Sequence, residues 1–490
     1  LMHAHSIGWY AACVFCVTRL LQQMSEQRWS GGLAGFFFTV NATHSFPVTW
    51  LSNRNSVMTT CFVALAVSQH HRWRTLGIPA AKSLSWALVW QTLALLSSES
   101  GVALTGWLLA FSVLIDRSSW RERCRSVLPY FGVSAVWFVA HRLSGFGVVH
   151  SGFYTDPGID LLQFLIQFIQ RVTVLWSSVF GFFFADFFSF ADSQTQALVL
   201  IYTFGVFALT AIVLAPMICR DRTLLFWVVC VLMTLVPLCA TWPMERLLLL
   251  PSLAARGVQA RFFERLSTVF STKRPWLWIR AVRFVAGWWV FWHLGVGVTT
   301  LPLRNATAVR LFGIYNRAPS DQRVPDLAHR RVVLVNTPDP FFSWHFSDIR
   351  RAAGRDVPNR IHVLATGATP LELIGSDPRM LVLRPIGDLL ANPVSKVYRD
   401  PRDRWPTTPI VTDGLTIKVQ SLRDNGQPES IEFRFDVPLD DPSLVWLEWR
   451  DGWYVPIRPP AVGQRTTLAQ AVPWSFYHWA QFAGVLGITI

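Results

Sequence analysis

The few ionisable side chains that interrupt the apolar runs of this sequence are the residues whose chemistry needs an explanation. A titratable group beside a long apolar run is costly unless it is paired or faces a cavity, so it is a functional candidate by default. Nine such groups lie in alternate breaks between the runs: His44, Arg54, Glu99, Arg142, Asp156, Asp186, Asp192, Glu245 and Arg246. The seven that we predict to bind substrate are His44, Arg54, Glu99, Arg142, Asp156, Glu245 and Arg246. Arginine suits a phosphate group, and a carboxylate suits a hydroxyl group.

Several of these candidates have a structural alternative that the sequence leaves open. Glu99 lies in a short polar break (LSSESG), where it could bind a substrate hydroxyl or a metal ion, or cap the next helix together with the serines before it. Glu245 and Arg246 open an apolar run and could simply pair with each other. His44 could be a hydrogen-bonded structural histidine.

The cysteines predict neither a zinc site nor a disulfide framework. Cys13 and Cys16 form a C-x-x-C pair, but they lie in an apolar run without a second ligand pair. All seven cysteines precede residue 304, so the last third of the chain has none. No metal ligand or catalytic residue is assigned, and a divalent cation is the one cofactor that stays open.

The composition divides the chain near residue 303. Residues 1–303 hold 22 of the 44 Lys and Arg residues but only 11 of the 30 Asp and Glu residues. Charged residues make up 15% of the chain, against roughly 25% in an ordinary soluble domain. The basic residues lie between apolar runs, so membrane topology explains them better than nucleic-acid binding. We therefore predict a polytopic α-helical membrane protein with a C-terminal, extracytoplasmic and mainly β domain.

Ten apolar runs are candidate membrane spans, because a crossing helix needs about 20 apolar residues and a packed helix can be shorter. The runs lie near 7–22, 31–46, 56–70, 83–98, 101–116, 127–141, 196–219, 223–242, 245–260 and 279–300. The excess of Lys and Arg places the loops around 19–28, 70–82, 117–125, 220–222 and 261–280 in the cytoplasm. The loops around 44–55, 97–101, 142–160, 187–195 and 242–246 are then external, and the last span exits outward.

Residues 160–186 do not fit this alternation. They are long enough to span a membrane, but both flanks read as external, and a single crossing would invert everything downstream. We expect an interfacial helix followed by a re-entrant or hairpin element, with Arg171 in the middle of the stretch.

Residues 304–470 are expected to form a soluble domain, and the apolar residues 471–490 could dock on the membrane. The predicted elements are a strand at 331–336, a helix near 341–353, and short strands at 361–365, 380–383, 416–421, 431–435 and 445–449. Asp451 and Gly452 between two β-prone arms predict a hairpin over 447–455. A small sandwich or barrel with one α/β element is the expected form.

Three segments together resemble a known family of membrane enzymes. They are residues 38–54 (FTVNATHSFPVTWLSNR), 95–99 (LLSSE) and 243–253 (PMERLLLLPSL). In order and approximate spacing they are similar to motifs of the GT-C type glycosyltransferases that use lipid-linked sugars, nearest the O-mannosyltransferases with a tetratricopeptide tail. The resemblance covers about residues 1–260. It implies a carboxylate that acts as general base for an acceptor while polyprenyl phosphate leaves, and Arg54, Arg142 and Arg246 would suit the phosphate.

The chain departs from the family pattern at five positions. Asn41 and Ala42 replace a His-Pro pair, and Phe46 replaces a Glu. Ser56 stands where an acidic residue usually follows the Arg, and Ser98 replaces a Lys. The family's catalytic Asp lies in an external loop before the helix with which this chain begins, so no residue here inherits that role, and we expect further sequence upstream. No 34-residue repeat follows residue 304.

The sequence therefore predicts a GT-C-like glycosyltransferase, active or diverged, in a bacterial-type inner membrane. Its domains would be a membrane part over 1–303, a β domain over 304–470 and an apolar segment over 471–490. Its partners would be membrane lipid, a polyprenyl-phosphate sugar and a glycan or protein acceptor. The alternative is a non-catalytic membrane scaffold whose external β domain binds a glycan or protein. A transporter ranks third, because no paired half-repeats are apparent.

Overall fold

The computed structural model describes residues 2–471, except residues 78, 148–149, 192, 272–273, 368 and 392. Contacts divide the chain into two units: Leu1–Val148 with Tyr154–Ala306, and Val149–Phe153 with Thr307–Ile490. The first is called the helical unit and the second the β unit. The boundary lies near residue 303, where the composition changes. Residues 472–490, the greater part of the apolar C-terminal segment, lie outside the described residues.

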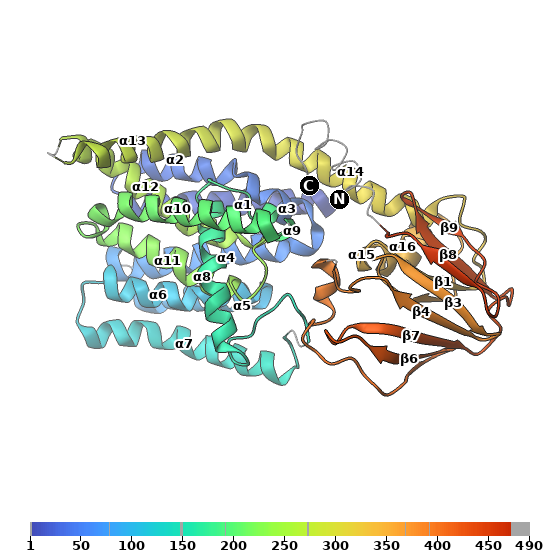
Figure 1. The fold of residues 1–490 in the computed structure, drawn as a ribbon. Coiled ribbons are helices and arrows are strands. Elements are labelled where there is room, and N and C mark those ends of the chain that lie inside the picture. Colours follow the sequence, from blue (N-terminus) through green and yellow to red (C-terminus); the bar gives the residue numbers. More distant parts are fainter. Residues whose placement is uncertain are drawn as a thin grey trace. The chain divides into compact units, whose positions relative to one another are not determined.

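The helical unit consists of long helices joined by short turns (Figure 1). The helices are α1 (Met2–Met24), α2 (Arg28–Thr39), α3 (Ser45–Thr49), α4 (Arg54–Leu76), α5 (Ala80–Ser97), α6 (Ala103–Leu114), α7 (Trp120–Leu143), α8 (Leu161–Val179), α9 (Ala185–Phe190), α10 (Ser193–Ile218), α11 (Arg222–Leu238), α12 (Leu249–Ser271), α13 (Trp276–Phe291) and α14 (Val298–Ser320). Short 3-10 turns are η1 (Ala42–His44), η2 (Leu51–Asn53), η3 (Glu99–Val102) and η4 (Glu245–Leu247), and the π-helical segment η5 (Trp292–Gly297) joins α13 to α14. Each of the ten predicted apolar runs is mostly helical.

Three of these helices are long and apolar enough to cross a membrane. They are Met2–Met24, Gln194–Ile218 and Trp276–Ala306, and Glu99–Leu114 and Arg222–Leu238 are shorter apolar helices. The described part of the chain is thus mainly helical, with three candidate spans and a C-terminal β region, which is compatible with a membrane protein that has a β domain. The predicted ten crossings and their orientation stay a prediction.

Charged contacts join several loops of the helical unit. Arg261 of α12 binds Glu26 of the α1–α2 loop at 2.9 Å and Asp221 at the start of α11 at 2.6 Å. Arg74 at the end of α4 binds Asp116 after α6 at 2.7 Å. All of these loops are among those that the excess of Lys and Arg predicts to be cytoplasmic.

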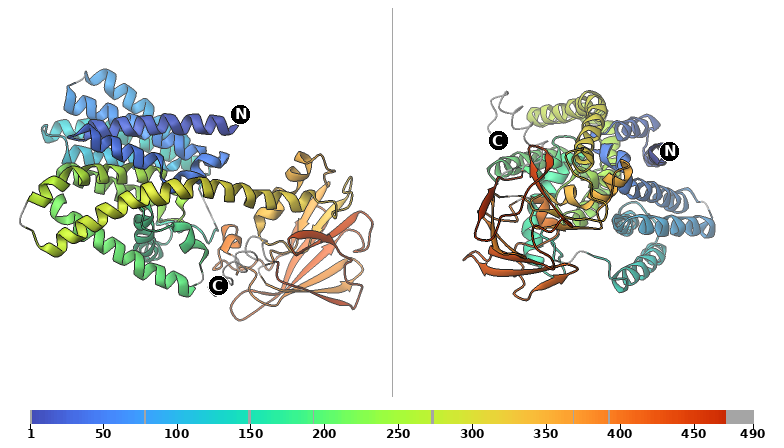
Figure 2. Two further views of the ribbon diagram at one scale, coloured as in Figure 1. Left: turned by 90° about the horizontal axis from the view of Figure 1, so that it is seen from above. Right: turned by 90° about the vertical axis from the view of Figure 1, so that its right-hand side faces the viewer.

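Helix α8 and the turn after it occupy residues 160–186, the stretch that did not fit the alternation. In Figure 1, α8 runs across the direction of the neighbouring long helices, and the left view of Figure 2 looks along its axis. Its first half exposes Leu161, Leu162 and Leu165, whereas residues 171–179 are buried. The helix ends at Val179, and the chain turns back at Gly181, whose φ of +76° suits glycine.

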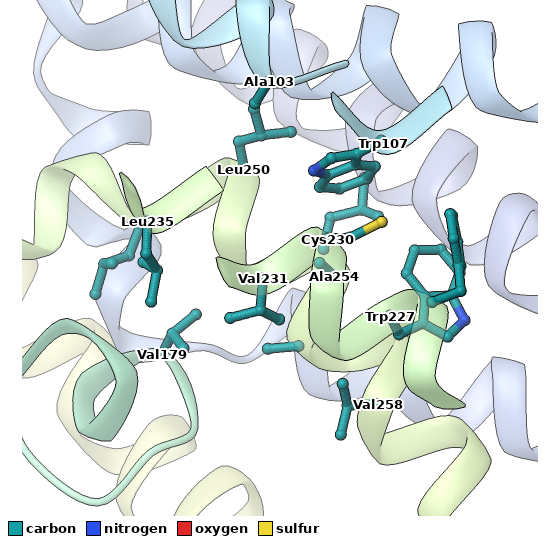
Figure 3. Packing of buried hydrophobic residues seen from close by; sticks show 14 of the residues in the cluster. Ala103, Trp107, Val179, Trp227, Cys230, Val231, Leu235, Leu250, Ala254 and Val258 are labelled. Carbon is teal, nitrogen blue, oxygen red and sulfur yellow. The ribbon is translucent and has the colours of Figure 1, made fainter. Parts of the chain in front are cut away.

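The core of the helical unit lies where α6, α11 and α12 pack (Figure 3). Trp107 and Trp227 meet edge to face with ring centroids 6.2 Å apart. Trp107 Nε1 donates to Thr234 Oγ1 at 2.9 Å, so this buried indole is hydrogen-bonded. Gly257 lies against the ring of Trp227, where a Cβ atom would collide with it. This close approach fixes α12, which carries several residues discussed below.

The β unit contains two sheets, the part of α14 from Thr307 on, the short helices α15 (Pro340–Trp344) and α16 (Phe346–Ala352), and the 3-10 turn η6 (Pro393–Val397). The strands are β1 (Arg331–Leu334), β2 (Arg360–Val363), β3 (Leu371–Asp377), β4 (Met380–Pro385), β5 (Ile410–Thr412), β6 (Leu415–Leu422), β7 (Pro428–Phe435), β8 (Leu444–Arg450), β9 (Trp453–Pro456) and β10 (Arg465–Leu468). One sheet has the order β2-β1-β8-β9, with β1 parallel to both β2 and β8, and the other is antiparallel in the order β10-β3-β4-β7-β6-β5.

Alternate side chains of β1 show how the layers pack. Val333 belongs to a core shared with the antiparallel sheet, whereas Val332 and Leu334 belong to a second core with Phe342 and Phe346 from the short helices. The two sheets therefore form a sandwich, and the helices cover the outer face of the four-stranded sheet. The predicted hairpin over 447–455 is confirmed: β8 pairs with β9, and Asp451 and Gly452 have φ of 51° and 89°.

Candidate functional site

Two of the three motif segments meet in the helical unit, although they are about 200 residues apart in sequence. The turn η1 and helix α3, from the first segment, contact η4, from the third. The Asn41 side chain caps η1 by accepting from Thr43 N at 3.2 Å. Asn53 donates to the carbonyl of Arg246 at 3.3 Å, which ties the end of the first segment to η4.

Glu245 lies at the centre of this meeting point and is fully buried. Its carboxylate forms an ion pair with Arg304 of α14, and its backbone N–H donates to Asp186 Oδ1 of α9 at 2.9 Å. Arg304 Nη2 also lies 3.4 Å from Asp186 Oδ2. Arg246 follows Glu245 in the same turn, η4. These four residues, Asp186, Glu245, Arg246 and Arg304, are called the carboxylate–arginine cluster.

The cluster keeps unused hydrogen-bonding capacity. Glu245 Oε1 and Arg246 Nε have no hydrogen-bond partner among the described residues, whereas Glu245 Oε2 and Arg304 Nη1 pair with each other. Arg246 has no carboxylate within ion-pair distance in the described part of the chain. Buried polar atoms are normally satisfied, so Glu245 Oε1 and Arg246 Nε are available to a ligand that carries hydroxyl and anionic groups.

Aromatic rings cover the two arginines. The guanidinium of Arg304 lies 5.0 Å from the ring centre of Phe184 and 6.0 Å from that of Phe46, and Arg246 lies 5.4 Å from that of Trp50. Phe46 occupies the position where the family pattern has a Glu. An apolar ring therefore contacts Arg304 here, and the carboxylates that neutralise Arg304 come from α9 and η4 instead.

His44 is buried and satisfied by neighbouring side chains. Its Nδ1 lies 3.0 Å from Tyr10 Oη, and its Nε2 lies 2.8 Å from Ser252 Oγ and 3.4 Å from Asn41 Nδ2. Because Tyr10 is on α1 and Ser252 on α12, His44 links three segments of the unit. These contacts match the structural alternative for His44, and only 1% of its surface is exposed.

Arg54 and Glu99 contact different partners. Arg54 begins α4 and binds the start of α1: its Nε donates to Ser6 Oγ at 2.9 Å, and its Nη1 lies 2.8 Å from His5 Nδ1. Glu99 begins η3, and its Oε1 lies 2.8 Å from Nε2 of His141 on α7. The Glu99 side chain is 72% exposed, and Ser98 caps the turn. In the described part of the chain, neither residue forms a hydrogen bond or ion pair with the carboxylate–arginine cluster.

Arg142 and Asp156 pair with each other, at a distance of 3.8 Å between Nη2 and Oδ2. Asp156 Oδ1 also accepts from the backbone N–H of Gly158 at 2.8 Å. Arg142 is mostly exposed, so this pair is a surface contact. Asp192 lies outside the described residues.

Of the seven predicted substrate-binding residues, Glu245 and Arg246 lie in the cluster. Asp186 was recognised as an ionisable candidate but was not selected, and Arg304 was missed. One sequence feature could have identified Arg304. Residues 284–303 contain no Asp, Glu, Lys or Arg, and Arg304 is the first charged residue after this apolar run. Taking residue 303 as the domain boundary separated Arg304 from the membrane part to which its side chain belongs.

The cluster offers two carboxylates for a metal ion. No group of three His, Cys, Asp or Glu side chains that could hold a metal occurs in the described part of the chain. A divalent cation there would need ligands from a bound phosphate, as magnesium commonly has.

Comparison with known proteins adds no relative. No protein-family model matches the chain, and no curated protein matches it.

Proposed function

We propose that this chain is an integral membrane glycosyltransferase-like protein of the GT-C type, which takes its sugar from a polyprenyl-phosphate donor. The observation that carries the proposal is the carboxylate–arginine cluster. It brings together two of the segments that resemble the family, and it holds a fully buried carboxylate beside an arginine without an ion pair.

The cluster has the groups that such a transfer demands. The bond between the sugar and the phosphate breaks, the acceptor hydroxyl forms the new bond, and the hydroxyl proton must go to a base. Glu245 and Asp186 are the carboxylates that could take this proton. Arg246 and Arg304 would stabilise the charge that develops on the leaving phosphate, because cations already in position act strongly in a site of low dielectric.

The same proposal covers the location of the protein, its acceptor and a metal ion. The ten apolar helices would form the membrane part of a bacterial-type inner membrane protein, and the β unit would lie outside the cytoplasm. The acceptor would be a glycan or a protein. A divalent cation could join the site together with the donor phosphate.

A transfer assay tests the proposal. Membranes that contain the full chain would be given polyprenyl phosphate carrying radiolabelled mannose, and the label would be followed into material that organic solvent does not extract. We expect Glu245→Gln and Arg246→Gln each to lower the rate about a hundredfold if they contact the transition state. Arg280→Gln is the matched control, because Arg280 stacks on Trp276 at 4.2 Å and belongs to another part of the unit. Equal rates in all variants, at equal expression, would contradict the proposal.

The β unit favours a second candidate function, a non-catalytic scaffold that binds a glycan or a protein. It contains a groove of about 620 Å³. Prolines line much of this groove, among them Pro325, Pro378, Pro442, Pro459 and Pro460. Such a lining is stiff and would lose little conformational entropy on binding. Glycan binding to the full chain without any transfer of label would favour the scaffold.

A further inference from the structure

Helix α12 carries a buried polar face in the middle of the helical unit. Ser252, Arg256 and Gln259 are spaced by four and three residues, so they lie on one side of the helix, and all three are fully buried. Arg256 has no carboxylate within ion-pair distance among the described residues. A buried guanidinium without a counter-charge is costly, so its hydrogen bonds must explain why it is there.

The first partner of Arg256 is the end of helix α8. Arg256 Nη2 donates to the carbonyl of Val179, the last residue of α8, at 2.5 Å. The three preceding carbonyls of α8 accept from backbone N–H groups of the turn that follows: Trp176 O from Phe180 N at 3.1 Å, Ser177 O from Phe182 N at 2.8 Å, and Ser178 O from Gly181 N at 3.1 Å. Arg256 therefore supplies the donor for the last carbonyl. The partial negative charge of the helix C-terminus offsets part of its cationic charge.

The second partner of Arg256 is His293, in the π-helical segment between α13 and α14. Arg256 Nη1 donates to His293 Nε2, and the ring of Phe37 stacks on the imidazole with centroids 4.6 Å apart. Single π-helical turns insert a residue into a helix and often occur at functional sites. Here the π segment lets the helix continue to Arg304 while His293 faces Arg256.

Both partners lead directly to the carboxylate–arginine cluster. Val179 precedes Asp186 by a tight turn, and that turn packs against α13: Trp288 Nε1 donates to Gly181 O at 2.8 Å. His293 precedes Arg304 on the same continuous run of helix. We propose that Arg256 is a positioning residue that holds Asp186 and Arg304 at their mutual distance by clamping the end of α8 to the π segment. The clamp is a feature of the fold, and its role in the reaction rests on the proposed function.

The first experiment tests the clamp without any enzyme assay. Ser189, on α9 just after Asp186, is buried and donates to Pro243 O at 2.5 Å. Ser189→Cys would be introduced into the full chain, in detergent, with the native cysteines replaced, and its reaction with N-ethylmaleimide would be timed. We expect Arg256→Met to speed this reaction at least about tenfold, because the turn before α9 loses its anchor.

Two further variants make this result decisive. Gln91→Leu is the matched control: Gln91 is fully buried and donates to Tyr130 O at 2.9 Å, on helices that do not carry the clamp. It should leave the labelling rate unchanged. His293→Phe removes the acceptor but keeps a ring against Phe37, so it should also speed labelling. This variant tests the clamp if Arg256→Met does not fold. An unchanged rate in the folded Arg256 and His293 variants would overturn the clamp.

The second experiment separates positioning from a purely structural role. Arg256→Met removes a buried cation that has no counter-charge, but it also leaves the Val179 carbonyl and His293 without their donor; the two effects oppose each other, so the thermal unfolding temperature should change little. With polyprenyl-phosphate mannose as donor, kcat should nevertheless fall about a hundredfold while KM changes little, because misplacement of the reacting groups by about 1 Å has that effect. Arg256→Lys, which keeps the charge, should restore part of the rate. An unchanged kcat would overturn the positioning role, whereas a parent without turnover would refute the proposed function and leave the labelling test to decide the clamp.

Discussion

Arg304 neutralises two carboxylates, so its removal has a cost that the structure defines. Arg304→Met leaves the fully buried Glu245 without its cation. Removing one partner of a buried pair costs about 3–5 kcal/mol, because the remaining charge stays buried and uncompensated. We expect Arg304→Met to lower the free energy of unfolding of the helical unit by about 4 kcal/mol, within that range.

The other members of the cluster should follow in a definite order. Asp186 lies 3.4 Å from Arg304, and its side chain is 24% exposed, so Asp186→Asn should cost only about 1 kcal/mol. Combining Glu245→Gln with Arg304→Met removes both charges of this ion pair and leaves only the partly exposed Asp186 without its arginine. The double variant should therefore recover about 2–3 kcal/mol of the loss caused by Arg304→Met, a coupling typical of residues in contact.

The measurement is equilibrium unfolding of the full chain in mixed detergent micelles, followed by the fluorescence of its 24 tryptophans. Arg280→Met is the matched control, because Arg280 lies on the same run of helix and stacks on Trp276 at 4.2 Å. It should cost no more than about 1 kcal/mol. If the effects of Glu245→Gln and Arg304→Met simply add, within about 0.5 kcal/mol, the ion pair does not exist in the folded protein and the reasoning is wrong.

Three further predictions concern the β unit and the topology. Residues 304–470 produced alone should unfold in one cooperative step by circular dichroism, because the sandwich has its own core. Burial, with Arg331 and Arg360 nearby, holds the pKa of His362 below its ordinary value of 6.5, so the unfolded chain takes up a proton more readily than the folded one. Stability of that fragment should fall as the pH drops below 6.5, and His362→Gln should flatten the dependence in urea titrations. In a cysteine-free background, Ser119→Cys should react with an impermeant maleimide only after the cytoplasmic side is opened, whereas Glu429→Cys should react from outside; the reverse result would invert the topology.

Length, hydropathy and turn chemistry predicted most of the secondary structure. Each long apolar run is mostly helical, because a run of that length buries or covers its backbone most completely as a helix. The hairpin of β8 and β9 followed from Asp451 and Gly452, which can adopt the positive φ that its turn needs. Strand β1, in contrast, pairs in parallel with β8 more than a hundred residues later. No local pattern specifies such a partner.

The candidate site was predicted only in part, for a physical reason. Sequence shows which groups are costly beside apolar runs, but not which side chain compensates them. Glu245 could have paired with its neighbour Arg246, yet it pairs with Arg304 on another helix. His44 could have faced a ligand, yet it meets Tyr10, and its other nitrogen finds a serine 208 residues away. Compensation inside a bundle is a tertiary property, so only the structure assigns it.

The departure at Phe46 bears on whether the cluster can support the proposed reaction. The two carboxylates and two arginines of the cluster balance in charge, and a polyprenyl-phosphate sugar would add one negative charge. When the sugar leaves, the phosphate gains a second negative charge and the acceptor releases a proton. If Glu245 or Asp186 takes that proton, the total charge of the site is the same before and after transfer, which a site of low dielectric strongly favours. A carboxylate at position 46 would place a further negative charge beside Arg304 and the leaving phosphate, whereas Phe46 places a ring there. In the proposed reaction, Phe46 would therefore leave the base in place and lower the repulsion that the leaving group meets.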